Sequence, residues 1–291
     1  IPVVTPHFTS FDQEESGLTA VVGADVVAYA IAAAEAMGAK LDGKGSVAVT
    51  VGSFNETENL VAETFKSTMA DQYPDITVLD PQEEGFDAAQ AIAKAVAIIQ
   101  GNPDIAGAFS TTGNGPTTWA RAAEETSASE LIIISMDYTR PNLDLVKAGQ
   151  VYGLVAQPLY EEFYAAAELV GAALDGETVE YLNLLPAPVI TIDDLDYYYG
   201  FNDKAEAGIA GESEAPAVAY KIALIQFLKG HPVHRLMQLG FTEGCEANGY
   251  DCSLLLTDST SPVDMIPLAE QALAEPVDGV VLYAVDNSFF P

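Results

Sequence analysis

The sequence has few basic residues, histidines and cysteines. Lys plus Arg number 11 against 43 Asp plus Glu, which gives a net charge of −32, and the 291 residues include three histidines, two cysteines and one tryptophan. A surface of this charge repels phosphate backbones and anionic membranes. Nucleic-acid binding is therefore disfavoured, and we expect a highly soluble protein, suited to salty surroundings.

Long hydrophobic runs are also missing. The Ala-rich stretch 26–38 contains Glu35 and falls short of the roughly 20 apolar residues that span a bilayer. The sequence begins at Ile1 with neither an initiator Met nor a signal peptide, so we expect a processed or an engineered end. Because 49% of the 291 residues are hydrophobic, the chain can build the cores of two ordinary domains or the core of one large domain.

The two cysteines lie close together in "CEANGYDC", at Cys245 and Cys252. Six residues separate them, which is too many for a CxxC redox or metal motif. The pair is either a disulfide formed in an oxidising compartment or two buried thiols. The turn at Asn248-Gly249 favours the disulfide, because it brings a helix end and a strand start together.

Short apolar β-branched runs alternate with helical patterns, which is typical of an α/β fold with parallel sheets. The predicted strands are 1–8, 19–24, 45–52, 75–81, 105–112, 131–137, 151–157, 188–193, 220–228, 252–258 and 278–285. The predicted helices are 24–38, 57–71, 87–100, 115–126, 140–148, 159–175, 233–248 and 262–275. Segment 204–219 is rich in Ala, Gly, Glu and Pro without a period and is predicted to be a flexible linker.

Several motifs resemble those of one family, although they occur in an unusual order. "FLKGHPVHRLMQLG" resembles a first strand with an "NPFF"-type loop, and "IPVVT" the phrase "GIPVVT". "GNPDIAGAFSTT" is similar to "HPDIxAVFAxND", "ISMDYT" stands where the family has "VGFDGT", and "VYGLVAQ" resembles "LxATVAQ". These motifs are those of the periplasmic sugar-binding proteins of ABC transporters, closest to the ribose-binding type.

The family order would begin at Tyr220, run to Pro291, resume at Ile1 and end near Asp203. We interpret the chain as a circular permutant, engineered or natural, in which the linker joins the usual termini; two joined fragments are the alternative. The helix that usually lies between "DNSFFP" and "GIPVVT" is absent from the sequence.

The resemblance implies two Rossmann-like lobes joined by a three-segment hinge. Lobe one would comprise 1–39, 158–186 and 220–291, and lobe two 40–157 and 187–203. A ligand would bind in the cleft between them, beyond the carboxyl ends of the strands, by hinge closure.

The same resemblance implies a set of ligand-binding residues: His231, His234, His7, Phe8, Asn59, Phe86, Thr112, Asn114, Trp119, Asp137 and Gln157. Carboxylate, amide and neutral imidazole groups suit hydroxyls, and aromatic faces suit the apolar side of a sugar. Each has a structural alternative: a core position for the aromatic rings, a turn cap for Asp137, a hinge hydrogen bond for Gln157 and a solvated position for Asn59. Extra glycines in "TTGNGPTT" depart from the family pattern at Thr112 and Asn114.

Pro232 suits the first turn of a helix, which would place His231 and His234 at a helix N-terminus, where the neutral imidazole is favoured. Where the family usually has arginine against the sugar, this chain has Phe8 and Asn59. The resemblance therefore implies a different pentose, a hexose or a sugar alcohol rather than ribose.

The expected function is capture of a neutral sugar or polyol and its delivery to the membrane permease of an ABC importer, outside the cytoplasm, by a monomer without a cofactor. One rival is a metal-dependent enzyme centred on His231, His234 and His7, although no HExxH motif supports it. Another is a sensor scaffold made from such a binding protein. A DNA-binding regulator of the same fold would need a basic helix-turn-helix, which the sequence lacks.

Overall fold

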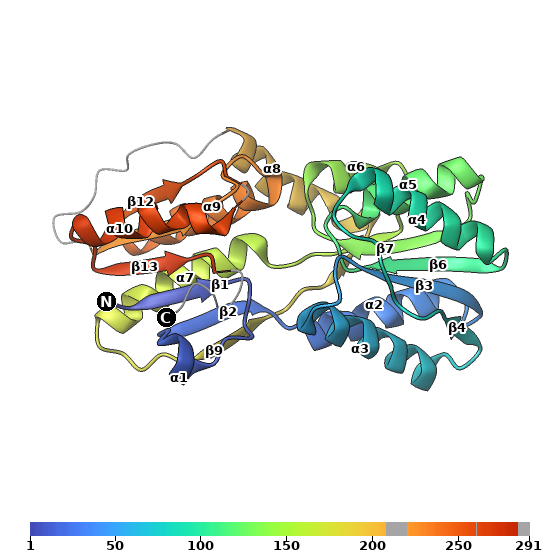
Figure 1. Ribbon diagram of the computed structural model, residues 1–291, viewed down its shortest axis with the longest axis horizontal. Helices are drawn as coiled ribbons and strands as arrows, with labels where there is room; N and C mark the ends of the chain where they lie inside the picture. The colour runs from blue at the N-terminus through green and yellow to red at the C-terminus, as the bar shows by residue number, and fades with distance from the viewer. Residues whose placement is uncertain (208–219, 260, 285–291) are drawn as a thin grey trace. The chain divides into compact units, whose positions relative to one another are not determined.

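The computed structural model describes residues 1–207, 220–259 and 261–284, and the chain divides into two compact units (Figure 1). Unit 1 comprises Ile1–Ala24, Pro158–Leu185 and Gly200–Pro291. Unit 2 comprises Asp25–Gln157 and Pro186–Tyr199.

The unit boundaries differ from the predicted ones. The first boundary falls after Ala24 instead of after residue 39, because helix α2 (Val26–Lys40) packs against helix α3 (Glu56–Gln72) of unit 2. The last segment of unit 2 ends at Tyr199 instead of residue 203.

The sheet of unit 1 has six strands, and all of them run parallel. Their spatial order is β12 (Asp251–Leu256), β11 (Lys221–Gln226), β13 (Gly279–Leu282), β1 (Val3–Pro6), β2 (Ala20–Ala24) and β9 (Leu182–Leu185). Strands β1 and β13 pair directly, with Val3 opposite Val280 and Val4 opposite Val281. The first and one of the last strands in the sequence are thus neighbours in one sheet.

Unit 2 has a second sheet of the same kind. Its order is β10 (Val189–Ile190), β8 (Gly153–Val155), β7 (Ile132–Met136), β6 (Ile105–Ser110), β3 (Gly45–Val51) and β4 (Ile76–Val78), and β5 (Gln82–Glu83) also pairs with β3. Only the edge strand β10 runs antiparallel among these described strands. Two sheets of parallel strands flanked by helices confirm the predicted α/β class.

All eight predicted helices form, and three of them begin at a side-chain cap. Asp25, Asn55 and Asp87 accept hydrogen bonds from backbone N–H groups in the first turns of α2, α3 and α4 (Ala88–Gly101). The others in unit 2 are α5 (Gly115–Thr126) and α6 (Arg140–Lys147), and unit 1 has α7 (Leu159–Leu174), α9 (Pro232–Asn248) and α10 (Ile266–Ala274) with the short η2 (Pro262–Met265) before it. The eleven predicted strands are confirmed as well, within the described residues.

Helix α7 packs on β1, β2 and β13, and α9 lies beside α7 (Figure 1). The two helices approach closely at glycines of α9. A Cβ on Gly240 would lie 2.0 Å from the carbonyl oxygen of Tyr160, and one on Gly244 would lie 2.9 Å from that of Tyr164. The sequence "LGFTEG" therefore places small residues where the two backbones meet.

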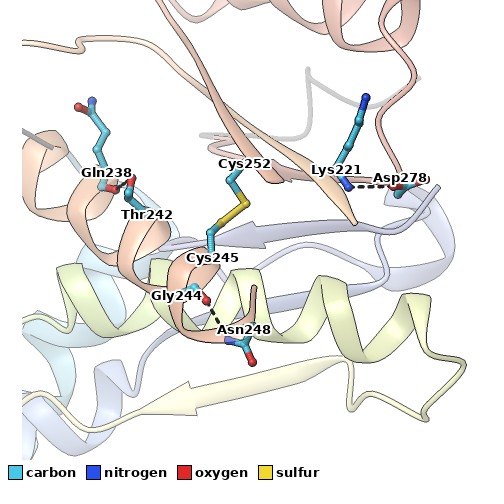
Figure 2. Close-up of a disulfide and its surroundings, with 8 residues drawn as sticks. All are labelled: Lys221, Gln238, Thr242, Gly244, Cys245, Asn248, Cys252 and Asp278. Carbon is cyan, nitrogen blue, oxygen red and sulfur yellow. Dashed lines mark hydrogen bonds between the residues drawn. A yellow bond between two sulfur atoms is a disulfide. The ribbon is translucent and has the colours of Figure 1, made fainter. Parts of the chain in front are cut away.

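A disulfide joins Cys245, in the last turns of α9, to Cys252 in β12 (Figure 2). Gly249 ends α9 in the left-handed conformation, with φ at +70°, and reverses the chain between the two cysteines. Of the two alternatives for this pair, the structure contains the disulfide.

Several elements were not predicted, among them the two-residue strand β5. Helix α1 (Gln13–Ser16) is a single turn, and β9 is a half-exposed edge strand whose Leu182 and Leu184 face outward. Helix α8 (Leu195–Ala207), which follows the short η1 (Ile192–Asp194), extends into the predicted linker. The prediction that the linker begins at residue 204 is wrong, because Ala205 is buried and Lys204 pairs with Glu243 at 2.9 Å.

The rest of the predicted linker, 208–219, and the "DNSFFP" motif lie outside the described residues. Among the residues that are described, we find no helix with the length and apolar character needed to cross a membrane.

Candidate functional site

The candidate residues of unit 1 follow the carboxyl ends of neighbouring parallel strands. His7 and Phe8 follow β1, Phe227 follows β11 and Tyr283 follows β13. In an open parallel sheet this edge is where ligands bind, because the loops and helix starts meet there. The sheet order alone therefore brings these side chains together.

Tyr283 lies at the centre of a group of rings that we call the ring cluster: His7, Phe8, Phe227, His231, His234 and Tyr283. The ring centroid of Tyr283 is 5.0 Å from His234, 5.7 Å from Phe227, 5.8 Å from His7 and 5.9 Å from Phe8. His231 is 5.6 Å from His234. The structure thus brings all three histidines of the chain to one edge of one sheet, together with Phe8.

His234 is a buried, neutral imidazole. Burial lowers the pKa of His234 to about 4, and its Nδ1 lies 2.7 Å from the carbonyl oxygen of Phe227. Since a carbonyl only accepts, we assign the proton to Nδ1, which leaves Nε2 as an acceptor. His231, at the N-cap position of α9, is exposed by comparison, and partial burial also lowers its pKa.

His7 adopts a left-handed backbone conformation with φ at +80°. Its Nδ1 lies 2.8 Å from Oε1 of Glu162, a fully buried carboxyl group in the first turn of α7. Burial raises the pKa of Glu162, and the neighbouring His7 opposes this shift. The pair fixes the orientation of the His7 ring within the ring cluster.

In unit 2, Phe86, Thr112 and Asp137 belong to what we call the strand-end patch, with Gly52 and Gly113 between them. A Cβ on Gly52 would meet the Phe86 ring at 2.7 Å and the Thr112 methyl group at 3.1 Å, and one on Gly113 would meet Oδ2 of Asp137 at 2.4 Å. Phe86 is 71% exposed. The extra glycine of "TTGNG" therefore lets the loop after β6 lie against the Asp137 carboxylate.

Asp137 is buried and has φ at +70°, so its turn needs support. Asn142 supplies it: its side-chain amide donates to the carbonyl oxygens of Gly113 at 3.0 Å, Asp137 at 3.1 Å and Met136 at 3.2 Å. Asn142 thus fixes the two loops that carry Thr112 and Asp137.

Next to the strand-end patch is a buried carboxylate, Glu84. It accepts hydrogen bonds from the hydroxyl groups of Thr50, Ser110 and Thr112. The indole N–H of Trp119 donates to the Thr50 hydroxyl at 3.1 Å. Trp119 has no exposed surface, so the prediction that its ring covers a ligand is wrong. Its hydrophobic face fills the core of unit 2, and its one donor belongs to this network.

The remaining predicted residues, Asn59, Asn114 and Gln157, are exposed or half-buried. Asn59 is exposed on the first turn of α3, and Asn114 is exposed at the N-cap of α5 without a side-chain capping bond. Gln157 is half-buried at the last residue of its segment of unit 2, where its backbone N–H donates to Val155.

Several site residues were missed. Phe227 and Tyr283 end apolar runs and could have been found by the same strand-end rule that found His7. Glu84 and Glu162 gave no signal, because one acidic residue among 43 carries no mark of its burial, and no motif marked Asn142.

Metal binding by the histidines finds no support in geometry. Across residues 1–207, 220–259 and 261–284, no three His, Cys, Asp or Glu side chains are grouped so that they could hold a metal ion. Nδ1 of His234 and Nδ1 of His7 are already committed to Phe227 and Glu162.

Comparison with known proteins gives one sequence family and a group of solved structures. The family described as periplasmic binding protein domain matches residues 1–178. A glucose-galactose binding protein, GanP, from Geobacillus stearothermophilus is 25% identical with a TM-score of 0.60, covering 67% of this chain and 69% of GanP. An arabinose binding protein, AraP, from the same organism is 25% identical with a TM-score of 0.58, covering 68% of this chain and 71% of AraP.

A sugar-binding protein of a sugar ABC transporter from Bacillus halodurans has the same fold, with 23% identity and a TM-score of 0.63, covering 68% of this chain and 72% of that protein.

Proposed function

This chain belongs to the periplasmic binding protein domain family, whose members are solute-binding proteins and not enzymes, and we propose that it captures a small neutral sugar or polyol. The ligand would be a pentose, a hexose or a sugar alcohol, handed to the membrane permease of an ABC importer. The proposal replaces the metal-dependent enzyme considered from the sequence, because the family is not enzymatic.

The ring cluster is the observation that carries the proposal. It combines aromatic faces, which suit the apolar side of a sugar ring, with the Nε2 acceptor of His234. In unit 2, the strand-end patch separately presents the exposed ring of Phe86 and the carboxylate of Asp137, which suit the same class of ligand because a carboxylate accepts from hydroxyls. Neither set contains Lys or Arg, so a neutral ligand fits better than an anion.

Two relatives point the same way, since one is a glucose-galactose binding protein and the other an arabinose binding protein. The disulfide Cys245–Cys252 supports a location outside the cytoplasm, because disulfides persist in oxidising compartments.

A thermal-shift screen tests the proposal, with D-glucose, D-galactose, L-arabinose, D-xylose, D-allose, myo-inositol and zinc as probes. A ligand at about 100 times its Kd stabilises the folded state by ~2.7 kcal/mol, which is a clear shift. We expect at least one sugar or polyol to shift the transition. A shift with zinc alone, and with no sugar or polyol, would contradict the proposal.

A pair of variants then ties binding to the ring cluster. His231→Ala should weaken binding of the sugar found in the screen without lowering the melting temperature of the free protein, because His231 is exposed. Arg235→Ala, one turn further along α9 and also exposed, is the matched control and should bind as the parent chain does.

We further propose that the chain is a circular permutant of the family. In the sheet of unit 2, read from β4 to β10, the strands have the spatial order 2-1-3-4-5-6 when β3 is counted as strand 1 and β4 as strand 2. The sheet of unit 1 has the same order only if the numbering begins at β11 and continues from β13 to β1. This is a common order of doubly wound sheets. The alignment coverage of about two thirds of each relative is what an in-order comparison would find for a permuted chain.

Reordering the chain tests the permutation. A variant in which Tyr220–Pro291 precede Ile1–Ala207 has the order of the family, and the peptide joining Pro291 to Ile1 would need a short designed linker. We expect this variant to fold with one cooperative transition and to bind the same sugar. A reordered chain that fails to fold with several linker lengths, while the given order folds, would contradict the proposal.

A further inference from the structure

Glu84 is a carboxylate enclosed at the carboxyl end of the unit 2 sheet. It directly follows β5, it is 1% exposed, and its backbone N–H donates to the carbonyl oxygen of Val51 at 2.8 Å. A buried charge of this kind is costly unless polar groups surround it. The polar groups that surround Glu84 therefore indicate its role.

Three hydroxyl groups converge on Glu84. Oε2 accepts from Thr50 of β3 and from Ser110 of β6 at 3.1 Å, and Oε1 accepts from Thr112 in the loop after β6. A carboxylate has only acceptor sites, and each hydroxyl has only one hydrogen. The hydrogen of Thr112 is thus directed inward to Glu84. Its oxygen, which also lies 3.2 Å from the Ser110 hydroxyl oxygen, offers only lone pairs to other partners.

Thr112 is also part of the strand-end patch. Its methyl group and the exposed ring of Phe86 both lie beside Gly52, and Gly113 next to it lies against Asp137. A ligand on this patch beside Phe86 and Asp137 would therefore lie next to Thr112, which is 7% exposed.

We propose that Glu84 is a specificity-determining residue: by taking the hydrogens of Thr50, Ser110 and Thr112, it makes Thr112 an acceptor that selects a ligand with a hydroxyl donor at this point. This inference rests on the proposed function of sugar or polyol capture. Glu84 acts through Thr112 and is a positioning residue.

The network also includes the single tryptophan of the chain. The indole N–H of Trp119 donates to Thr50, whose own hydrogen goes to Glu84. A substitution at Glu84 should therefore change the NMR resonance of the Trp119 indole proton. Since the chain has one tryptophan, this resonance is a single signal, and it can be observed without a ligand.

The test compares a sugar that binds in the thermal-shift screen with its monofluoro analogues, in which fluorine replaces one hydroxyl at a time and cannot donate. We expect the parent chain to lose about tenfold in affinity for the analogue that lacks the donor facing Thr112. In Glu84→Gln an NH2 group, which donates hydrogen bonds, replaces one carboxylate oxygen, which accepts them. A hydroxyl that donated to that oxygen loses its acceptor and can turn its hydrogen outward. The discrimination should then fall to about threefold or less at that ring position.

The matched control is Glu83→Gln, the same change at the adjacent exposed carboxylate, which should keep the parent discrimination. Thr112→Val removes the hydroxyl but keeps the shape, so it should lose the same discrimination, and adding Glu84→Gln to it should change nothing further. Discrimination that persists in Glu84→Gln or in Thr112→Val would overturn the proposal. Should Glu84→Gln fail to fold, Thr112→Val decides between these outcomes.

Failure of the proposed function is distinguishable from failure of this inference. If no sugar or polyol binds the parent chain, the proposed function fails, and the network is read from the proton resonance of the Trp119 indole. Glu84→Gln should move this resonance and slow or speed its exchange with water, whereas Glu83→Gln should not. An indole resonance unchanged in Glu84→Gln would overturn the role of Glu84.

Discussion

At the scale of single residues, His234 couples the stability of unit 1 to pH. Its pKa is lowered from the ordinary value of 6.5 to about 4 in the folded protein, mainly by burial. Between these two values the unfolded chain binds a proton that the folded chain does not. The stabilisation is therefore complete above pH 6.5 and is lost as the pH falls towards 4.

His234→Asn tests this coupling, because its amide nitrogen can still donate to the carbonyl oxygen of Phe227. Relative to this variant, the parent chain should lose up to ~3 kcal/mol of unfolding free energy between the two pKa values. Denaturant unfolding at each pH measures the difference. Comparing variants at the same pH removes the effect of the many surface carboxylates.

His231→Asn is the control, since the same change at an exposed histidine should leave a much smaller pH dependence. Equal stability differences between the parent chain and His234→Asn at all these pH values would contradict the account of His234 as a buried neutral group.

The location of a single residue could be predicted from the sequence when the residue lies at the end of a predicted strand or shortly after it. His7, Phe8, His231 and His234 follow strands of one sheet, and parallel strands bring their ends to one edge. Trp119 was misassigned because three or four residues into a helix the side chain can face either the core or the sheet edge. Glu84 was beyond prediction, since its three hydroxyl partners come from strands far apart in the sequence.

At the scale of elements, the contact of α7 with α9 depends on the absence of a side chain at Gly240. Because an added Cβ would lie 2.0 Å from the backbone oxygen of Tyr160, Gly240→Ala must push the helices apart. We expect a loss of about 1–3 kcal/mol or more in unfolding free energy. Gly101→Ala at the end of α4 meets open space and should change stability by less than ~0.5 kcal/mol. Equal effects of the two changes would contradict this packing.

The disulfide stabilises the connection of α9 to β12. Cys245 and Cys252 are seven residues apart in sequence, and closing a loop of this size removes about 2.5 kcal/mol of chain entropy from the unfolded state. Replacing both cysteines by serine should lower the unfolding free energy by roughly this amount, as measured by urea unfolding. A reductant should destabilise the parent chain equally and leave the double variant unchanged; sensitivity of the double variant would point to another cause.

The elements themselves were largely readable from hydrophobic pattern and caps. Continuous apolar runs such as "IALIQ" (222–226) and "LIIIS" (131–135), together with Asp or Asn caps, marked nearly all of them, because buried parallel strands and helix starts have strong local preferences. The half-exposed strand β9 and helix α8 were missed, since the first lacks a continuous apolar run and the second is stabilised by Lys204 and Ala205 contacts with distant residues.

At the scale of the whole molecule, the net charge of −32 opposes folding through self-repulsion. Raising NaCl from about 0.01 M to about 1 M shortens the Debye length from ~30 Å to ~3 Å and screens this repulsion. The melting temperature should rise by about 2–4 °C for every kcal/mol of repulsion removed. Chloride and bromide salts should act alike, because screening depends on ionic charge. A melting temperature that falls or stays constant over this range would contradict this effect of the surface charge.

The proposed circular permutation was suggested by the sequence, because motifs resembling those that open the family's fold occur after residue 219. The pairing of β1 with β13 agrees with that interpretation at the level of the sheet. The unit boundaries could not be predicted from the sequence. The first boundary depends on whether α2 packs with the strand before it or with α3, and this contact is between residues far apart in the chain.

The most direct test of the central claim, that the chain captures a neutral sugar or polyol, is isothermal titration calorimetry of the full chain with the probes of the thermal-shift screen. The account predicts that one of them binds at one site per chain, with a dissociation constant on the order of micromolar, equivalent to about −8 kcal/mol. Absence of binding heat for every sugar and polyol at several temperatures, in protein that unfolds cooperatively, would contradict it.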